Sequence, residues 1–185
     1  ILDELGLPSR SVKSKKDLDL VDGLIIPGGE STVMSLLIND NDLFVPLKKF
    51  GKKKPVMGTC AGLILMSKNC NDTKINSFGF LDIDILRNAY GSQINSKEEM
   101  VNYNFGDGNY LKISTTLIRA PEIIRYSKDS IVLGRLKSDP VAILSGHFLG
   151  LTFHPELNGI KIFHEVLFDI KSKYFYKNII KNYET

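Results

Sequence analysis

Cys60 lies among small residues in the segment 58–62, Gly-Thr-Cys-Ala-Gly, a spacing that can present a nucleophile. A short apolar run at 55–59 leads into the cysteine and the apolar residues 63–66 follow it, so the pattern predicts a strand that turns sharply into a helix. Small neighbours relieve the strain of such a turn. The pattern is the thiol form of the Gly-x-Ser-x-Gly nucleophile elbow, in which the helix N-terminus favours a thiolate. The alternative is a buried structural cysteine.

A second group with catalytic potential is His154-Pro155-Glu156, which follows a predicted strand at 148–153. In an extended backbone, residues i and i+2 project to the same side, so the imidazole and the carboxylate can meet. Pro155 favours this backbone by biasing His154 away from helical angles. A cysteine nucleophile needs a histidine base, and that histidine needs an acceptor that fixes its tautomer. We therefore predict a triad of Cys60, His154 and Glu156.

Strands and helices alternate around these residues. Strands are predicted at 23–26 and 55–59, and helices at 33–38, at 43–50 and after the elbow. Alternation of this kind gives parallel strands with right-handed crossovers, and active sites lie beyond their carboxyl ends. We predict an α/β, flavodoxin-like three-layer sandwich. Its central sheet is mostly parallel with helices on both faces, and some antiparallel strands lie in the C-terminal half.

The other elements are predicted from shorter patterns. They are a helix end closed by Gly6, strands at 7–12, 80–86, 111–118, 131–136, 141–144 and 148–153, a turn of helix or loop at 17–22, a polar loop at 87–93, a surface insertion or hairpin at 94–110, and a closing helix at 160–176. The sequence contains no repeat or low-complexity linker, so residues 1–185 are predicted to form a single domain.

The composition is that of an ordinary globular domain. The 185 residues are 43% hydrophobic and 24% charged, with a formal charge of +3. Basic and aromatic residues do not interleave as in nucleic-acid-binding proteins, and no apolar run reaches the length of a membrane span, so neither partner is expected. Cysteines at 60 and 70 make a poor disulfide framework, which indicates a reducing, cytoplasmic compartment. The sequence has no Gly-x-Gly-x-x-Gly and no histidine spacing typical of metal ligands, so no cofactor or metal is expected.

The elbow, His-Pro-Glu and the earlier Pro-Gly-Gly together resemble the class I (triad) glutamine amidotransferases. Further motifs narrow the resemblance to the glutaminase subunits of pyridoxal 5′-phosphate synthase. They are Pro-Gly-Gly-Glu-Ser-Thr at 27–32, the threonine inside the elbow, Arg-Asn-Ala-Tyr-Gly-Ser-Gln at 87–93 and Ile-Arg-Ala-Pro at 118–121. The resemblance extends from about Asp22 to Glu156.

This resemblance implies that Cys60 attacks the carboxamide of L-glutamine, releasing ammonia and leaving a thioester for water. It implies an oxyanion hole formed by the N–H groups of Gly29 and Ala61. The glutamine-binding positions that it implies are Gly29, Glu30, Ser31, Arg87, Ile118 and Arg119. Arginine suits the α-carboxylate of glutamine, and Glu30 suits the α-ammonium. The implied partner is a synthase subunit with a dodecameric core, which activates hydrolysis and receives the ammonia. Pyridoxal phosphate is then that partner's product.

The chain departs from the family's pattern in three places. The family begins with a strand bearing Leu-Gln-Gly that nothing here matches, so we expect this sequence to lack its first strand. The stretch 94–110 follows the family loosely, and Leu86 stands where a polar residue is common. The alternatives are a glutaminase serving another amidotransferase, a cysteine hydrolase of similar fold, and an inactive binding module. The Glu-Ser pair at 30–31 and the Arg-Asn pair at 87–88 argue against another amidotransferase.

Overall fold

The computed structural model describes residues 1–87 and 97–184, so most of the loop expected at 87–93 and the start of the 94–110 segment lie outside the described residues. The strands are β1 (Leu24–Ile26), β2 (Val56–Thr59), β3 (Ser67–Cys70), β4 (Leu81–Leu86), β5 (Lys97–Asn104), β6 (Tyr110–Leu117), β7 (Glu122–Tyr126), β8 (Ile131–Leu136), β9 (Asp139–Ser145) and β10 (Phe148–Leu151). The α-helices are α1 (Lys15–Leu18), α2 (Ser31–Asp40), α3 (Phe44–Gly51), α4 (Ala61–Met66), α5 (Ile162–Phe168) and α6 (Tyr176–Glu184). Two short 3₁₀ helices are η1 (Asp3–Leu5) and η2 (Pro155–Asn158).

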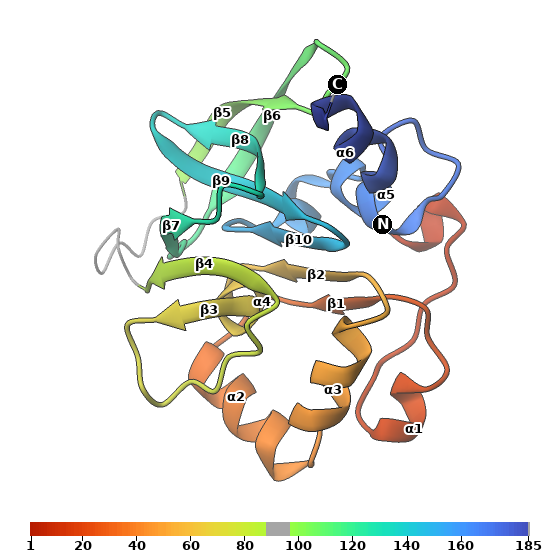
Figure 1. The fold of residues 1–185 in the computed structure, drawn as a ribbon, viewed down its shortest axis with the longest axis vertical. Helices are drawn as coiled ribbons and strands as arrows, with labels where there is room; N and C mark the ends of the chain where they lie inside the picture. Colours follow the sequence, from red (N-terminus) through yellow and green to blue (C-terminus); the bar gives the residue numbers. More distant parts are fainter. Residues whose placement is uncertain (88–96, 185) are drawn as a thin grey trace.

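The described strands form a seven-stranded sheet and a three-stranded sheet (Figure 1). The larger sheet has the order β1-β2-β10-β9-β8-β5-β6, and the smaller has the order β3-β4-β7. In the larger sheet, β2 pairs in parallel with β1 and with β10. The pairs from β10 through β9, β8 and β5 to β6 are antiparallel. The α/β prediction is confirmed, with the parallel pairing concentrated where the sheet begins.

The three parallel strands end at one edge of the sheet. Ile26 of β1 is in register with Gly58 of β2, and Leu151 of β10 is in register with Thr59. The chain leaves each strand one residue or a few residues before a predicted functional segment. The Pro-Gly-Gly turn, the elbow and His-Pro-Glu therefore all lie at the carboxyl edge of the sheet. Active sites in such sheets are found at this edge.

Side chains on the two faces of the sheet enter two separate cores. Val56 belongs to one cluster and its neighbour Met57 to the other, because successive strand residues point to opposite faces. Helices α2, α3 and α4 contribute to the first cluster, and α5 and α6 to the second. Figure 1 shows α2 and α3 on the lower side of the strands β1 and β2, and α5 and α6 near the opposite side. This arrangement gives the three predicted layers.

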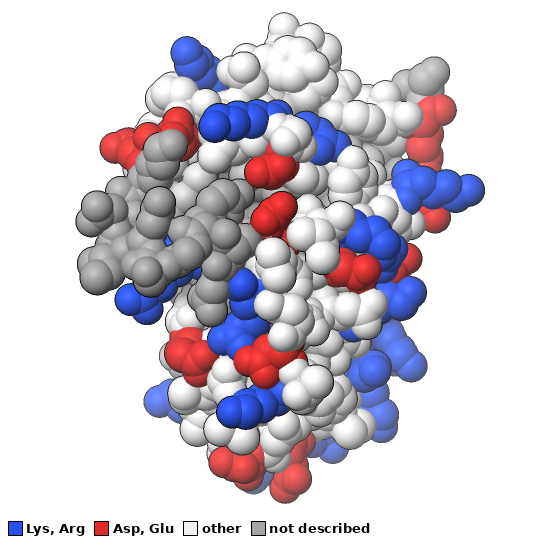
Figure 2. All heavy atoms as spheres, turned by 90° about the vertical axis from the view of Figure 1, so that its left-hand side faces the viewer, with Lys and Arg blue, Asp and Glu red and all other residues white. Residues whose placement is uncertain are grey.

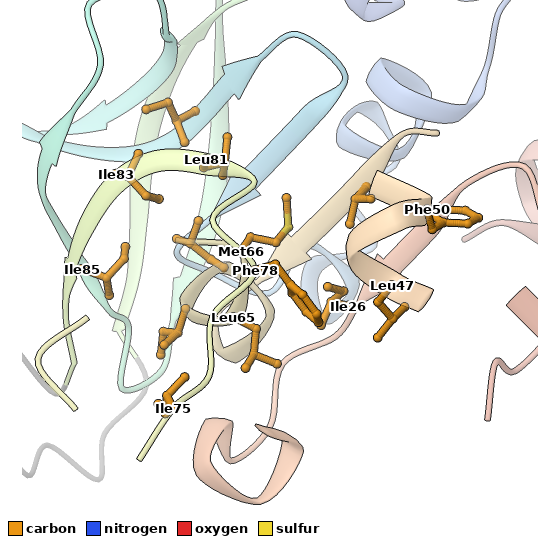
Figure 3. Close-up of a cluster of buried hydrophobic side chains, with 14 of the residues drawn as sticks. Ile26, Leu47, Phe50, Leu65, Met66, Ile75, Phe78, Leu81, Ile83 and Ile85 are labelled. Atoms are coloured by element: carbon orange, nitrogen blue, oxygen red, sulfur yellow. The ribbon is translucent and has the colours of Figure 1, made fainter. Parts of the chain in front are cut away.

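The first core holds helix α4 and the β3–β4 segment together (Figure 3). Leu65 and Met66 of α4 are fully buried, and Phe78 from the β3–β4 connection packs in the same cluster. The Phe78 ring is also one of the two inner rings in a stack of four aromatic rings. The stacked pairs are Phe44–Phe78, Phe78–Phe80 and Phe80–Phe148, with centroids about 5 Å apart. The stack ties the helix α3 and strand β10 to the connection, so the elbow helix lies in a rigid surrounding.

The second core anchors the residue that precedes His154. Phe153 is fully buried, and its ring lies 5.2 Å from that of Phe163 of α5 in an edge-to-face arrangement. Tyr103 lies 5.1 Å from the same Phe163 ring. Each large aromatic side chain buried here contributes on the order of 1.5–3 kcal/mol of hydrophobic free energy. The backbone position of His154 is therefore fixed by packing one residue earlier.

Three predicted features are wrong. The extended backbone expected through His154-Pro155-Glu156 ends at His154, because Pro155 can begin a helix and Pro155–Asn158 forms η2. Residues 7–12 form no strand, because residues 8–11 are exposed and no described strand pairs with them. The single closing helix at 160–176 is instead the helix α5, a turn, and the separate helix α6. Asp169 accepts a hydrogen bond from the backbone of Lys171, and the Ser172 hydroxyl donates to Glu165. Such local side-chain bonds compete with helix continuation.

The smaller sheet was not predicted from the sequence. Strand β3 begins where the sequence indicated only the end of a helix, and it pairs in parallel with β4, with Cys70 opposite Ile85. Strand β7 pairs with β4 on the other side, and Arg125 of β7 bridges Asp82 and Asp84 of β4. The described side chains in Figure 2 show acidic and basic groups mixed on the face in view.

The predicted strands at 80–86, 111–118, 131–136, 141–144 and 148–153 are all present within a few residues, and the described part of the 94–110 segment belongs to the β5–β6 hairpin. Gly6 closes the helical turn η1 in a left-handed conformation, with φ of 67°. Among the residues that the structure describes, none of the helices combines the length and apolar character that a membrane span requires.

Candidate active site

Cys60 stands at the corner between strand β2 and helix α4, as the elbow motif predicts. Its backbone has φ of 49° and ψ of −104°, a conformation that is costly for a residue with a side chain. The corner is fixed because the Cys60 N–H donates to the carbonyl of Leu151 over 2.9 Å. The cysteine is a free thiol, 8% exposed. Strained backbone held by the surrounding structure is typical of a functional position.

Gly62 explains how the helix comes so close to the neighbouring strand. A Cβ atom at this position would lie 1.9 Å from the carbonyl oxygen of Ile26, which no rearrangement of side chains could relieve. Glycine therefore lets α4 start directly against the end of β1. This contact places the Cys60 corner beside the Pro-Gly-Gly turn that follows Ile26.

His154 links Cys60 to Glu156. Its Nδ1 lies 2.7 Å from Oε1 of Glu156. The Cys60 side chain also interacts with the ring, and this interaction is the largest cause of the raised pKa of His154. Gly28 lies against the same ring, because a Cβ there would be 2.0 Å from Cε1 of His154. The structure thus brings the three predicted triad residues together, with His154 between the other two.

The electrostatics of the three groups favour a charged imidazole. The hydrogen bond to Cys60, and after it the one to Glu156, raises the pKa of His154 to about 10, although burial acts in the opposite direction. Burial is the largest single influence on the Glu156 carboxyl and would raise its pKa, but the hydrogen bond with His154, a backbone hydrogen bond and the positive charge of the nearby histidines together outweigh it, so the pKa is lowered. A negative carboxylate therefore supports a positive imidazolium, which is the state in which histidine can give a proton to a leaving group.

The two predicted oxyanion donors follow two neighbouring parallel strands, Gly29 after β1 and Ala61 after β2. Ala61 is the first residue of α4, so its N–H has no acceptor within the helix. Gly29 has φ of 156°, a value that residues with a side chain rarely adopt, and it follows the glycine that touches His154. A Cβ at Gly29 would lie 3.2 Å from the sulfur of Met34. Both N–H groups belong to turns at the carboxyl edge of the sheet.

Glu30 and Arg87 form an ion pair next to this turn. Glu30 is the N-cap of α2, and its carboxylate accepts from the N–H groups of Thr32 and Val33 at 3.2 and 2.6 Å. The Val33 hydrogen bond is the main reason that the pKa of Glu30 is lowered. Nη2 of Arg87 lies 3.2 Å from Oε1 of Glu30. The two groups predicted to bind the charged ends of glutamine therefore contact each other.

The remaining predicted substrate residues occupy two places. Ser31 is buried as the first residue of α2, directly after Glu30. Ile118 and Arg119 follow strand β6, which packs against η2, the helix that contains Glu156. The larger sheet curls enough for its last strand to reach this point. Arg119 is exposed and has φ of 45°. The curl accounts for the nearness of 118–119 to the triad side of the molecule.

Two residues near Arg87 were missed by sequence reasoning. Asp72 contacts Nη1 of Arg87, and the side-chain oxygen of Asn71 accepts from the Arg87 N–H over 2.9 Å. The sequence could have pointed to these two residues only if the parallel pairing of β3 with β4 had been predicted. With Cys70 opposite Ile85, the residues that follow β3 lie beside those that follow β4.

The other two histidines have separate surroundings. Nε2 of His147 lies 2.7 Å from the carbonyl oxygen of Gly51. His164 is buried in α5, and burial lowers its pKa. Within residues 1–87 and 97–184, no three or more His, Cys, Asp or Glu side chains gather as a metal site would require.

The fold and this site define a glutamine amidotransferase. The chain belongs to the SNO glutamine amidotransferase family, whose pattern it matches over residues 2–171. It is similar to the pyridoxal 5′-phosphate synthase subunit PdxT of Thermoplasma volcanium, with 43% identity over 161 residues, 86% of this chain and 78% of that protein. The PdxT subunit of Thermosipho africanus is 37% identical over 174 residues, 94% of this chain and 91% of that protein.

Solved structures agree with this assignment. A crystal structure described as a glutamine amidotransferase superposes with a TM-score of 0.77 and 28% identity, covering all of this chain and 90% of the other. The crystal structure of a glutamine amidotransferase from Thermotoga maritima, with a TM-score of 0.55 and 12% identity over 98% of this chain and 86% of that one, shares the fold.

Proposed function

We propose that this chain is the glutaminase subunit of a pyridoxal 5′-phosphate synthase, and that Cys60, His154 and Glu156 are its catalytic triad. The observation that carries the proposal is that the Cys60 side chain and the Glu156 carboxylate both interact with the His154 ring. It lies where three parallel strands end, in a chain related to PdxT subunits. We further propose that residues 1–185 act as one domain and work in the reducing cytoplasm, where a catalytic thiol stays reduced.

The reaction begins with the thiolate of Cys60. The sulfur attacks the carboxamide carbon of glutamine, and the carbonyl π electrons move to oxygen to give a tetrahedral oxyanion. The N–H groups of Gly29 and Ala61 stabilise this oxyanion. In comparable enzymes, removing one such donor lowers kcat by about 10²–10³-fold. The imidazolium of His154 gives its proton to the amide nitrogen, and the C–N bond breaks to release ammonia.

Water completes the cycle. The remaining γ-glutamyl thioester is attacked by a water molecule whose proton is taken by the neutral His154 ring. The tetrahedral intermediate collapses and the C–S bond breaks, which regenerates the Cys60 thiolate, and the new carboxyl group of glutamate loses its remaining proton to solvent. Glu156 keeps the imidazole in the tautomer that presents Nε2 to the sulfur and supports its positive charge. Each proton given up in the first half of the reaction is thereby recovered in the second.

Recognition of the substrate involves the two ends of glutamine. The carboxamide lies at the triad, and the α-ammonium and α-carboxylate lie toward Glu30 and Arg87. Ser31, Ile118 and Arg119 complete this subsite in the proposal. In the free protein Glu30 and Arg87 pair with each other over 3.2 Å. A bound α-amino acid can replace this pair by two pairs of opposite charge, its ammonium with Glu30 and its carboxylate with Arg87.

Coupling to a partner follows from the chemistry. A glutaminase that ran alone would waste glutamine and release ammonia, so hydrolysis is expected to be switched on by docking to a synthase subunit with a dodecameric core. The proposed switch is the turn at Gly28 and Gly29, because two glycines let a peptide group reorient at low steric cost. Docking would turn the Gly29 N–H toward the oxyanion.

The test compares glutamate formation by the chain alone and in complex with the synthase subunit. An oxyanion donor acts mainly in the transition state, so the partner is expected to raise kcat more than it lowers KM. A glutamine-analogue alkylator should label Cys60 stoichiometrically and leave Cys70 unlabelled, as read by mass spectrometry. Turnover of esters or peptides without release of ammonia from glutamine would contradict the proposal.

A further inference from the structure

Asp72 shares the guanidinium group of Arg87 with Glu30, and no step of the reaction above uses it. Nη1 of Arg87 contacts the Asp72 carboxylate, whereas Nη2 contacts Glu30. The side chain of Arg87 is 15% exposed and that of Asp72 is 27% exposed. Solvent and salt screen such partly buried charges less than they screen surface pairs. The contact is therefore strong enough to affect what binds beside it.

The position of Asp72 is fixed from several directions. Its carboxylate accepts from the backbone N–H of Lys74 over 2.9 Å. Its carbonyl accepts from the Cys70 thiol over 3.4 Å. Asn71 holds the backbone of Arg87 from the same loop. The loop after β3 thus holds both the main chain and the side chain of Arg87, and the carboxylate has a defined place in the free protein.

The three charged side chains do not cancel. Glu30 and Asp72 each carry a negative charge and Arg87 carries one positive charge, so the group has a formal charge of −1. With Asp72 absent, Glu30 and Arg87 would neutralise each other. With Asp72 present, the guanidinium is shared between two carboxylates, so Arg87 neutralises the charge of Glu30, whose side chain is 54% exposed, only in part.

We propose that Asp72 is a specificity-determining residue of the glutamine subsite. It compensates Arg87, so that the subsite favours ligands that bring an ammonium group and disfavours anions that lack one. This inference rests on the proposed function, because it assumes that Glu30 and Arg87 face the α-carbon of glutamine. It adds a residue 15 positions before Arg87 that works by charge and does not itself contact the reacting atoms.

Two fragments of glutamine with opposite charge test the idea. The first is 4-carbamoylbutanoate, which lacks the α-amino group and carries a charge of about −1, and the second is 4-aminobutanamide, which lacks the α-carboxylate and carries about +1. Each is used as a competitor of glutamine hydrolysis by the chain in complex with the synthase subunit. Asp72→Asn removes one charge and keeps the shape of the side chain.

The expected result has opposite signs for the two competitors. Asp72→Asn should tighten inhibition by 4-carbamoylbutanoate and weaken inhibition by 4-aminobutanamide. Each inhibition constant should change by about three- to tenfold, as expected for one partly screened charge a few ångströms away. Asp72→Glu keeps the charge and should keep the wild-type preference. Asp82→Asn, which removes a carboxylate from the Arg125 pair on β4, should leave both constants unchanged.

If Asp72→Asn weakened inhibition by both fragments, the inference would be overturned, since this result would mean that Asp72 only holds Arg87 in place. Unchanged constants would overturn it as well, as would failure of both fragments to compete in the unaltered enzyme. If the unaltered complex does not hydrolyse glutamine at all, the proposed function fails, and this inference fails with it. If the complex hydrolyses glutamine but Asp72→Asn leaves the preference between the two fragments unchanged, only the inference about Asp72 fails.

Discussion

Gly28 lies against the imidazole ring of His154, so closely that a Cβ atom at position 28 would be 2.0 Å from Cε1 and 2.8 Å from Nε2. The turn that follows β1 therefore forms one wall of the space occupied by His154, the proposed catalytic base. The same turn contains Gly29, the proposed oxyanion donor. A movement of this turn would change both the position of the imidazole and the direction of the N–H group, which couples two parts of the proposed mechanism.

Gly28→Ala is expected to lower kcat by about 100-fold or more, because the added methyl must displace the His154 ring and small misplacements of catalytic groups are costly. Glutaminase activity of the complex and circular dichroism of the variant measure the effect and the integrity of the fold. The matched control is Gly146→Asn in the turn between β9 and β10, where φ is 55° and no described atom lies within 4 Å of the new Cβ. Near-wild-type activity of Gly28→Ala would show that the ring is not held as described.

The triad makes an ordered set of predictions. Cys60→Ala and His154→Ala should each abolish glutaminase activity, a loss of about 10⁴-fold or more, while the fold persists. Glu156→Gln should lose less, by a margin on the order of 100-fold, because the carboxylate orients and supports the base without transferring a proton. Steady-state glutamate release measures all three variants. A Glu156 variant that is more impaired than the His154 variant would reverse the assigned roles.

Stability should depend on pH through His154. Its pKa is raised to about 10 in the folded protein, from 6.5, first by the hydrogen bond to Cys60 and then by that to Glu156. Between these two values the folded chain holds a proton that the unfolded chain has lost, so the stabilisation is complete below pH 6.5 and disappears as the pH rises through 10. Partial exposure of the ring reduces the size of the effect.

The measurement is urea unfolding of the wild-type chain and of His154→Gln at about pH 6.5, 8 and 9.5. The free energy of unfolding of the wild-type chain should fall more steeply with pH than that of the variant. Taking the difference between the two proteins cancels the other titrating groups. A wild-type chain that gains stability relative to the variant as the pH rises would contradict the raised pKa of His154.

Gly62→Ala should have two opposing effects on the stability of the protein. Alanine in a helix is favoured over glycine by about 1 kcal/mol. Here the new Cβ would meet the carbonyl oxygen of Ile26 at 1.9 Å, and overpacking against backbone costs about 1–3 kcal/mol or more. The clash should win, and the variant should unfold at lower urea concentration and lose activity as the elbow moves. An increase in the urea midpoint would mean that α4 can shift freely.

The elements nearest the site were predictable because their signals are local. The β-branched run at 24–26 and the glycines of the elbow each specify a backbone shape within a few residues, and the structure has those shapes. The His-Pro-Glu segment brings its imidazole and carboxylate together as predicted, but Pro155 and Glu156 do so from the 3₁₀ helix η2 and not from an extended backbone. The triad itself could be predicted because parallel strands end at a common edge, so Cys60 and His154 meet although they are far apart in the sequence.

The features that were missed depend on long-range pairing. Strand β3 has the exposed polar residues Lys68 and Asn69, which show no strand period, and it is a strand because β4 lies beside it. Asp72 acquires its contact with Arg87 through that pairing alone. Similarly, the apolar positions after Phe168 continue a helical pattern, but Ile170 is 76% exposed because the chain turns away from the core. Propensity gave the wrong answer where tertiary contacts decide.

The central claim is that ammonia released at Cys60 enters pyridoxal phosphate. The most direct measurement combines the chain with a synthase subunit in the presence of that subunit's carbon substrates, supplies glutamine labelled with ¹⁵N in the amide, and determines the isotope in the product by mass spectrometry. The account predicts pyridoxal phosphate with ¹⁵N in its ring, no product from glutamine when Cys60→Ala replaces the wild-type chain, and restored product when free ammonium is added to that variant. Unlabelled product, or labelled product formed equally well by the Cys60→Ala variant, would contradict it.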